Sequence, residues 1–103
     1  MKHEKKVTLM PKSVKRLQTL GEQIRLARLR RGISVNLASE RAGVSRSTVW
    51  QIEKGSGSVS MAAYVAVLHA LNDLDRDILL IASEDSLGRD IQDAKLLNKS
   101  KRK

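Results

Sequence analysis

Apolar residues recur along most of this chain at the three- and four-residue intervals of an amphipathic helix. Leu17, Leu20, Ile24 and Ala27, for example, form one apolar stripe in the first predicted helix. No stretch alternates between apolar and polar residues as a half-buried strand does, so the predicted fold class is all-α. The pattern predicts five helices, the fifth a short one, at about 13–31, 34–42, 46–54, 61–71 and from Asp73 or Asp75 to Ala82. The apolar side of the fourth is expected to comprise Met61, Tyr64, Val65, Leu68 and Leu71.

Serine and glycine mark where these helices begin and end. Ser34, Ser45 and Ser60 each precede a predicted helix, where a serine side chain caps the first free backbone amides. Gly32 and Gly43 follow the first and second helices, where glycine adopts the left-handed conformation that closes a helix. Residues 34–54 are therefore predicted to contain two short helices separated by a tight turn at Gly43.

The two ends of the chain differ in composition from the middle. Residues 1–12 are charged and are expected to form a basic N-terminal arm, followed by a helical domain over residues 13–83. Residues 84–103 are expected to form a basic C-terminal tail, in which SLGRDIQDAKLL has the pattern of a weak amphipathic helix. The final NKSKRK is too charged to fold alone. Both tails are expected to be flexible.

The charge is unevenly distributed along the chain, which carries a net +9. Residues 1–55 account for +9, residues 56–88 for −4 and residues 89–103 for +4. A basic N-terminal half favours a polyanionic partner such as nucleic acid, although a soluble protein with a disordered basic tail has the same charge. Without cysteine, a signal peptide or an apolar run long enough to span a membrane, the expected location is the cytoplasm.

Residues 34–54 have the pattern of a helix-turn-helix, the strongest functional signal in the sequence. Small and apolar residues stand where the two helices must approach and pack, namely Ser39, Gly43, Val49 and Ile52. The other face of the second helix is polar and carries Arg46, Ser47, Trp50, Gln51 and Lys54. Arginine pairs bidentately with guanine and glutamine with adenine, so this face is suited to reading bases in a major groove.

The run LGEQIRLARLRRGISVNLASERAGVSRSTVWQIEKG resembles the Cro/lambda-repressor class of helix-turn-helix domains, the XRE family. The resemblance implies a five-helix domain in which Arg46, Ser47 and Gln51 contact base edges. The phosphate contacts that follow from it are Ser45, Thr48, Lys54 and Ser34. It further implies that Arg28 and Glu53 form a structural pair inside the domain.

Two departures from the family pattern concern the first helix of the motif. Val35 replaces the glutamine that usually contacts phosphate, so one phosphate contact is in doubt. The usual leucine–alanine pair is replaced by Ala38 and Ser39, and Leu37 is expected to supply the missing core volume.

Trp50 is the least expected residue of the polar face and has two interpretations. As an exposed side chain it would contact a thymine methyl or sugar, or anchor a protein partner. Alternatively, it folds against the N-terminal arm or the preceding helix and has a structural role.

The predicted function is a sequence-specific, double-stranded DNA-binding transcriptional repressor that binds a palindromic operator as a homodimer. The fourth and fifth helices, with Leu79, Leu80 and Ile81, are the expected dimer surface. The sequence from Gly55 onward is similar to HipB-like antitoxins, which implies autoregulation of its own operon and a HipA-like kinase toxin as partner. The alternatives are a toxin-neutralising interaction module with secondary DNA binding, and a phage-type repressor without a toxin. The scarcity of aromatic residues argues against single-stranded RNA binding.

No pattern in the sequence indicates an enzyme, a cofactor or a metal site. His3 and His69 are far apart and lack a surrounding ligand set. The acidic residues Asp73, Asp75 and Asp77 are better explained as charges at the N-terminus of the fifth helix, with His69 on the surface.

Overall fold

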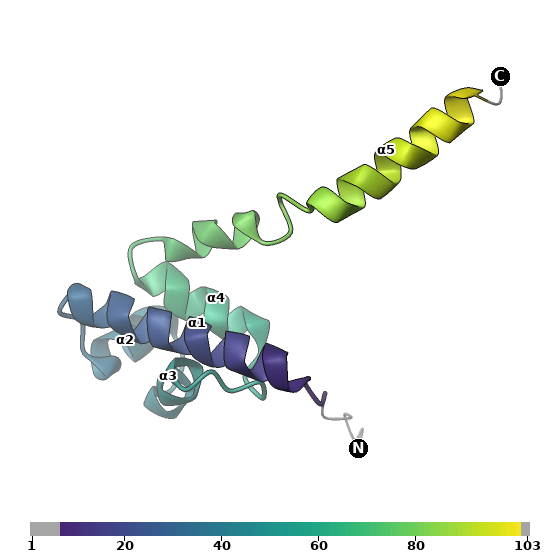
Figure 1. The fold of residues 1–103 in the computed structure, drawn as a ribbon. Helices are drawn as coiled ribbons and strands as arrows, with labels where there is room; N and C mark the ends of the chain where they lie inside the picture. The colour runs from purple at the N-terminus through teal and green to yellow at the C-terminus, as the bar shows by residue number, and fades with distance from the viewer. Residues whose placement is uncertain (1–6, 102–103) are drawn as a thin grey trace, which may run out of the picture.

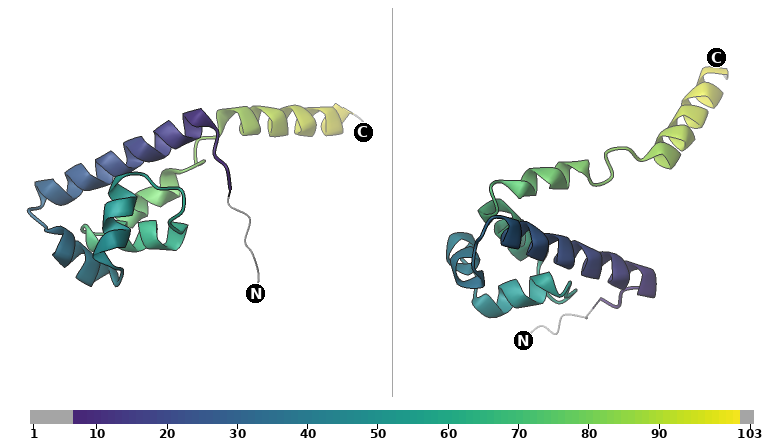
Figure 2. Two further views of the ribbon diagram at one scale, coloured as in Figure 1. Left: turned by 90° about the horizontal axis from the view of Figure 1, so that it is seen from below. Right: turned by 60° about the vertical axis from the view of Figure 1, so that its left-hand side comes forward.

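The computed structural model describes the backbone of residues 7–101 and the side chains of residues 7–98. This part of the chain contains helices and no strand, so the all-α class is confirmed. Helices α1 to α4 pack into one body, and α5 projects away from it (Figures 1 and 2). The elements are α1 (Pro11–Arg30), α2 (Val35–Ala42), α3 (Arg46–Glu53), α4 (Met61–Ala70), the 3-10 helix η1 (Leu74–Leu80) and α5 (Ser86–Lys101).

Apart from Tyr64, the core is small and aliphatic, as expected for a chain without phenylalanine. It lies where α1 contacts α3 and where α2 contacts both α3 and α4. Of the predicted stripe on α1, Ile24 and Ala27 are buried, while Leu20 stays 36% exposed. Leu37 packs against the core from α2, as predicted. The fully buried large side chains are Ile24, Val49, Ile52, Val67 and Leu71.

The three predicted serine caps are confirmed. The hydroxyl oxygens of Ser34, Ser45 and Ser60 accept hydrogen bonds from backbone amides three residues further on, at 3.0, 3.0 and 3.1 Å. Gly43 closes α2 with φ of 71°, and the amide of Val44 donates to the carbonyl of Ser39 at 3.1 Å. These local bonds set the turn between α2 and α3.

Helix α3 is held against α1 by two glycines that the sequence pattern did not single out. A Cβ on Gly21 would lie 2.5 Å from the carbonyl oxygen of Ile52, and one on Gly55 would lie 2.5 Å from the Cα of Gln18. The backbones of α1 and the C-terminal end of α3 therefore touch directly. Side chains at either position would separate the two helices.

The start of α1 and one packing assignment on α4 differ from the prediction. Helix α1 begins at Pro11 rather than residue 13, because proline is well suited to the first turn of a helix. On α4, Met61 is 63% exposed, and Val67 fills the core position instead. Helical spacing alone did not distinguish these two faces, because α4 is apolar nearly all round.

The predicted fifth helix is a 3-10 helix, Leu74–Leu80, that ends before Ala82. It follows two residues with positive φ, Asn72 at 57° and Asp73 at 68°. Leu74 packs against the core, but none of the residues of this helix is fully buried. Little of the packing that supplies most of the stability of an α-helix is therefore present here.

The C-terminal region differs from the expected tail, because residues 86–101 form one continuous helix. A carboxylate oxygen of Asp85 accepts from the amide of Gly88 at 3.2 Å and so caps its first turn. Leucine and lysine, the most frequent residues of this segment, are strong helix formers without any tertiary contact. Most of the predicted N-terminal arm, residues 1–6, lies outside the described residues, and residues 7–10 precede α1 without regular structure.

A search of the helices in residues 7–101 found none that combines the length and the apolar character needed to span a membrane.

Candidate nucleic-acid interface

The outer face of α3 brings together the residues that the sequence predicted to read DNA. All of these side chains lie on the side of α3 opposite Val49 and Ile52, which are fully buried. One face of the helix is thereby fixed by the core and the other is left open. An open depression lies on this face and is lined by Ser45, Arg46, Ser47, Trp50, Gln51 and Lys54.

The polar groups of this face are available to a ligand. Arg46, Ser47 and Gln51 are exposed. Among the side chains of residues 7–98, no carboxylate lies within ion-pair distance of Arg46 or Lys54. The surface therefore presents uncompensated positive charge beside donors and acceptors for base edges.

The predicted phosphate contacts divide into two groups. Ser45 and Lys54 lie in the depression, whereas Ser34 and Thr48 do not. The Ser45 hydroxyl is 2.9 Å from that of half-buried Thr48, and the Ser34 hydroxyl caps α2. These side chains organise the helix N-termini, whose free amides are the groups that bind an anion.

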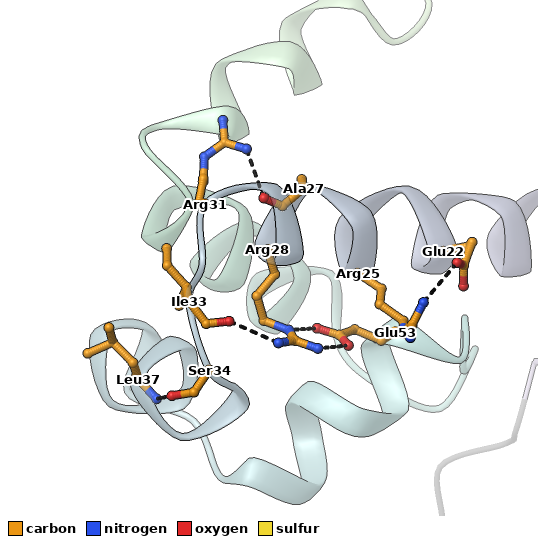
Figure 3. A network of polar contacts seen from close by, with 9 residues as sticks. All are labelled: Glu22, Arg25, Ala27, Arg28, Arg31, Ile33, Ser34, Leu37 and Glu53. Atoms are coloured by element: carbon orange, nitrogen blue, oxygen red, sulfur yellow. Dashed lines mark hydrogen bonds and ion pairs between the residues drawn. The ribbon is translucent and has the colours of Figure 1, made fainter.

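Arg28 and Glu53 form the structural pair that the resemblance implied (Figure 3). Each residue is only 6% exposed. The Nε and Nη2 atoms of Arg28 donate to the two carboxylate oxygens of Glu53 at 2.6 and 3.0 Å. Nη1 donates to the carbonyl of Ile33 at 2.9 Å, so the guanidinium links α1, α3 and the loop before α2. The hydrogen bond with Glu53 raises the pKa of Arg28, which remains charged at any working pH.

Residues 19–77 match a family model described as a helix-turn-helix domain. This match covers more than half of the chain and runs from α1 into η1. The chain belongs to this helix-turn-helix family. No curated protein matches it. Helix-turn-helix domains are DNA-binding modules, in which the second helix of the motif enters the major groove. In this chain that helix is α3, the helix that carries the open polar face.

Within this helix-turn-helix domain, Gly21 and Gly55 position the recognition helix without facing DNA. Both are needed where the backbones of α1 and α3 touch. Their only signal in the sequence is a small residue at a helix crossing, which cannot be recognised until the crossing partner is known.

Trp50 is 53% exposed and lines the depression, as the functional interpretation requires. We expect Trp50→Ala to weaken DNA binding about fivefold or more, because an apolar contact at the centre of an interface is lost. The free energy of unfolding should change by less than about 0.5 kcal/mol, as for most surface substitutions. Fluorescence-anisotropy titration and urea denaturation measure the two effects.

Leu29→Ala is the matched control, since Leu29 is 47% exposed on α1, outside the depression. It should leave DNA affinity unchanged. A large loss of stability in Trp50→Ala would instead favour the structural role.

His69 lies beside two carboxylates at the end of α4. Its Nδ1 is 3.1 Å from carboxylate oxygens of both Asp73 and Asp75. The three side chains lie close together, with His69 and Asp73 exposed and Asp75 half-buried. Asp75 and Asp77 lie in the first turn of η1, as predicted for charges at a helix N-terminus. The contacts of His69 with the two carboxylates explain why these three side chains lie together.

The hydrogen bond that His69 donates to the Asp75 carboxylate, followed by the negative charge of that carboxylate, raises the pKa of His69 above the ordinary 6.5. The pKa of His69 is higher in the folded chain than in the unfolded chain, so its contact with Asp75 stabilises the fold fully at a pH below the unfolded pKa. This stabilisation is lost as the pH rises through the folded-state pKa. We expect Asp75→Asn to lower the pKa of His69 in an NMR titration of the imidazole, and Asp77→Asn to leave it nearly unchanged. Equal shifts in both variants would contradict the specific contact.

Proposed function

We propose that this chain is a sequence-specific, double-stranded DNA-binding transcriptional repressor that acts on a palindromic operator as a homodimer. The observation that carries the proposal is the outer face of α3, where Arg46, Ser47 and Gln51 stand exposed around one depression. Fully buried Val49 and Ile52 fix the orientation of that face.

In this proposal α3 lies in the major groove. Arg46 donates two hydrogen bonds to a guanine, and Gln51 pairs with an adenine through its amide. Ser47 contacts either base type, and Trp50 packs against a thymine methyl. Lys54 and the amides at the Ser45 cap hold flanking phosphates and fix the register.

The charge distribution supports a phosphate-dominated affinity. Residues 1–55, which include α3, carry +9, while residues 56–88 carry −4. We expect the logarithm of the affinity to fall linearly as the logarithm of the salt concentration rises.

The homodimer would place two α3 helices about one turn of DNA apart, in successive major grooves.

Affinity selection from random DNA duplexes tests the proposal, because it reports base preference and half-site spacing together. Arg46→Ala should lower affinity by about 5- to 150-fold and relax the preference at one base pair, the range of a bidentate contact. Arg76→Ala removes the same charge from η1 and should preserve the selected sequence. Selection that yields no consensus would contradict sequence-specific binding.

The narrower proposal is an antitoxin that represses its own operon and binds a HipA-like kinase toxin. Its support is the likeness of the region after Gly55 to HipB-like proteins. A neighbouring HipA-like reading frame whose product co-purifies with this chain is the expected result. A specific operator without such a partner would favour a phage-type repressor, and toxin neutralisation by a DNA-binding-deficient Arg46→Ala chain would favour an interaction module.

A further inference from the structure

An apolar groove lies on the body of the protein between α1, α4 and η1. Its volume is about 270 Å³, and Asp77 and Gln23 are the polar residues at its margin. Ile81, which lines the groove, is 67% exposed, and its neighbours in the chain, Leu79 and Leu80, are 81 and 69% exposed. An exposed apolar surface of this kind marks an interaction site. The apolar lining comprises Leu20, Ile24, Leu68, Leu74, Ile78 and Ile81, with Ala27 beneath them.

Helix α5 carries a second apolar surface without a partner. Leu87, Ile91 and Ala94 share one face of this helix, at intervals of three and four residues. Leu87 is 71% exposed and Ile91 is 50% exposed. Lys95 lies one turn after Ile91 and flanks this face, whereas Leu96 lies on the opposite side.

The turn before α5 directs the helix away from its own groove. The Ser83 hydroxyl donates to the carbonyl of Leu80 at 2.8 Å, and Nη2 of Arg89 donates to the carbonyl of Ser83 at 2.6 Å. These bonds connect the end of η1 to the first turn of α5. The helix consequently extends outward into solvent in all three views (Figures 1 and 2).

The margins of the two surfaces offer one pair of opposite charges. Residues 56–88, which contain α4 and η1, carry −4. In residues 86–98 of α5, the two basic residues Arg89 and Lys95 are balanced by two acidic ones. Asp77 at the margin of the groove and Lys95 beside the apolar face of α5 are the residues best placed to pair. A lysine beside an apolar helix face complements a carboxylate at the margin of an apolar groove.

We propose that two copies of this chain exchange α5, so that each α5 lies in the α1–α4–η1 groove of the other copy. Leu87 and Ile91 then pack on the apolar lining, and Lys95 lies beside the partner's Asp77. This inference rests on the homodimer in the proposed function and specifies how it forms. In Figure 1, η1 lies above α1 and α3 lies below it, so the exchange leaves both recognition helices free.

Analytical ultracentrifugation of the full chain tests the apolar contact. Ile91→Gln should raise the dimer dissociation constant about tenfold or more, because it removes a buried isoleucine from each of two equivalent contacts. Leu96→Gln is the matched control, since Leu96 is 56% exposed on the opposite face of the same helix. It should leave the constant unchanged, and circular dichroism should show the same helix content in both variants.

Charge reversal distinguishes exchange between copies from folding of α5 onto its own body. Lys95→Glu and Asp77→Lys each place like charges together in a homodimer and should weaken it severalfold at low salt. A mixture of the two chains has opposite charges at both contacts of the heterodimer. Native mass spectrometry of an equimolar mixture should then show more heterodimer than the statistical half.

A monomeric wild-type chain, a dimer insensitive to Ile91→Gln, or a statistical mixture of the charge-reversed chains would each overturn the exchange. Failure of the proposed DNA-binding function would appear in the DNA selection and not in these measurements of the dimer. A dimer that obeys these tests but selects no DNA sequence would overturn the repressor. A monomer that selects a consensus would overturn the exchange and the homodimer but not sequence-specific DNA binding.

Discussion

Arg28→Met should destabilise the domain by about 3–5 kcal/mol, the largest effect expected of any single substitution here. Arg28 and Glu53 are almost fully buried and joined by two hydrogen bonds. Without the guanidinium, the carboxylate is left in a nonpolar environment without a counter-charge, and the carbonyl of Ile33 loses a donor. Equilibrium urea denaturation followed by circular dichroism measures the loss.

Two variants control for this prediction. Arg25→Met breaks the exposed pair with Glu22, whose side chains are 46% and 54% exposed, and should cost less than about 1 kcal/mol. The double variant Arg28→Met with Glu53→Met removes both charges and should recover much of the stability. A loss below 1 kcal/mol in Arg28→Met alone would show that the pair does not hold the domain together.

Gly21→Ala should destabilise the domain by about 1–3 kcal/mol or more and also weaken DNA binding. The added methyl group would lie 2.5, 2.6 and 2.8 Å from three backbone atoms at the end of α3. Backbone cannot rotate aside as a side chain can, so α3 has to move away from α1. Urea denaturation and operator titration should both report the shift, even though Gly21 is remote from the reading face.

Gly88→Ala is the comparison, because Gly88 also lies inside a helix but its nearest neighbours are atoms of the Asp85 carboxylate. That side chain can rotate away, which gives up its hydrogen bond to the Gly88 amide. The helix preference of alanine offsets this loss, so stability and DNA binding should both change little. Equal losses in the two variants would contradict the role of the α1–α3 contact.

Local signals predicted α2, α3 and the turn between them correctly. Ser34 and Ser45 cap the two helices and Gly43 ends the first of them, as expected. These features depend on bonds between residues three to five positions apart, so their cause is present in the sequence. The exposed side of α3 followed from the spacing of Val49 and Ile52 for the same reason.

The predictions that were wrong concern helices whose buried face is small or cannot be identified from the spacing of apolar residues. Helix α4 is apolar on nearly every side, and the spacing assigned Met61 to the core where the structure places Val67. The 3-10 geometry of η1 and the length of α5 were also missed, because both elements lack buried contacts that would impose a pattern on the sequence.

The sequence by itself determined the helix boundaries in the motif and the chemistry offered by α3, because caps, glycine turns and helical spacing act over a few residues. Only the tertiary structure decided how that chemistry is positioned. It brought Gly21 against Ile52, and it showed the groove and α5 as two apolar surfaces without partners. These relations join residues distant along the chain, and they depend on helix crossings that no local interaction specifies.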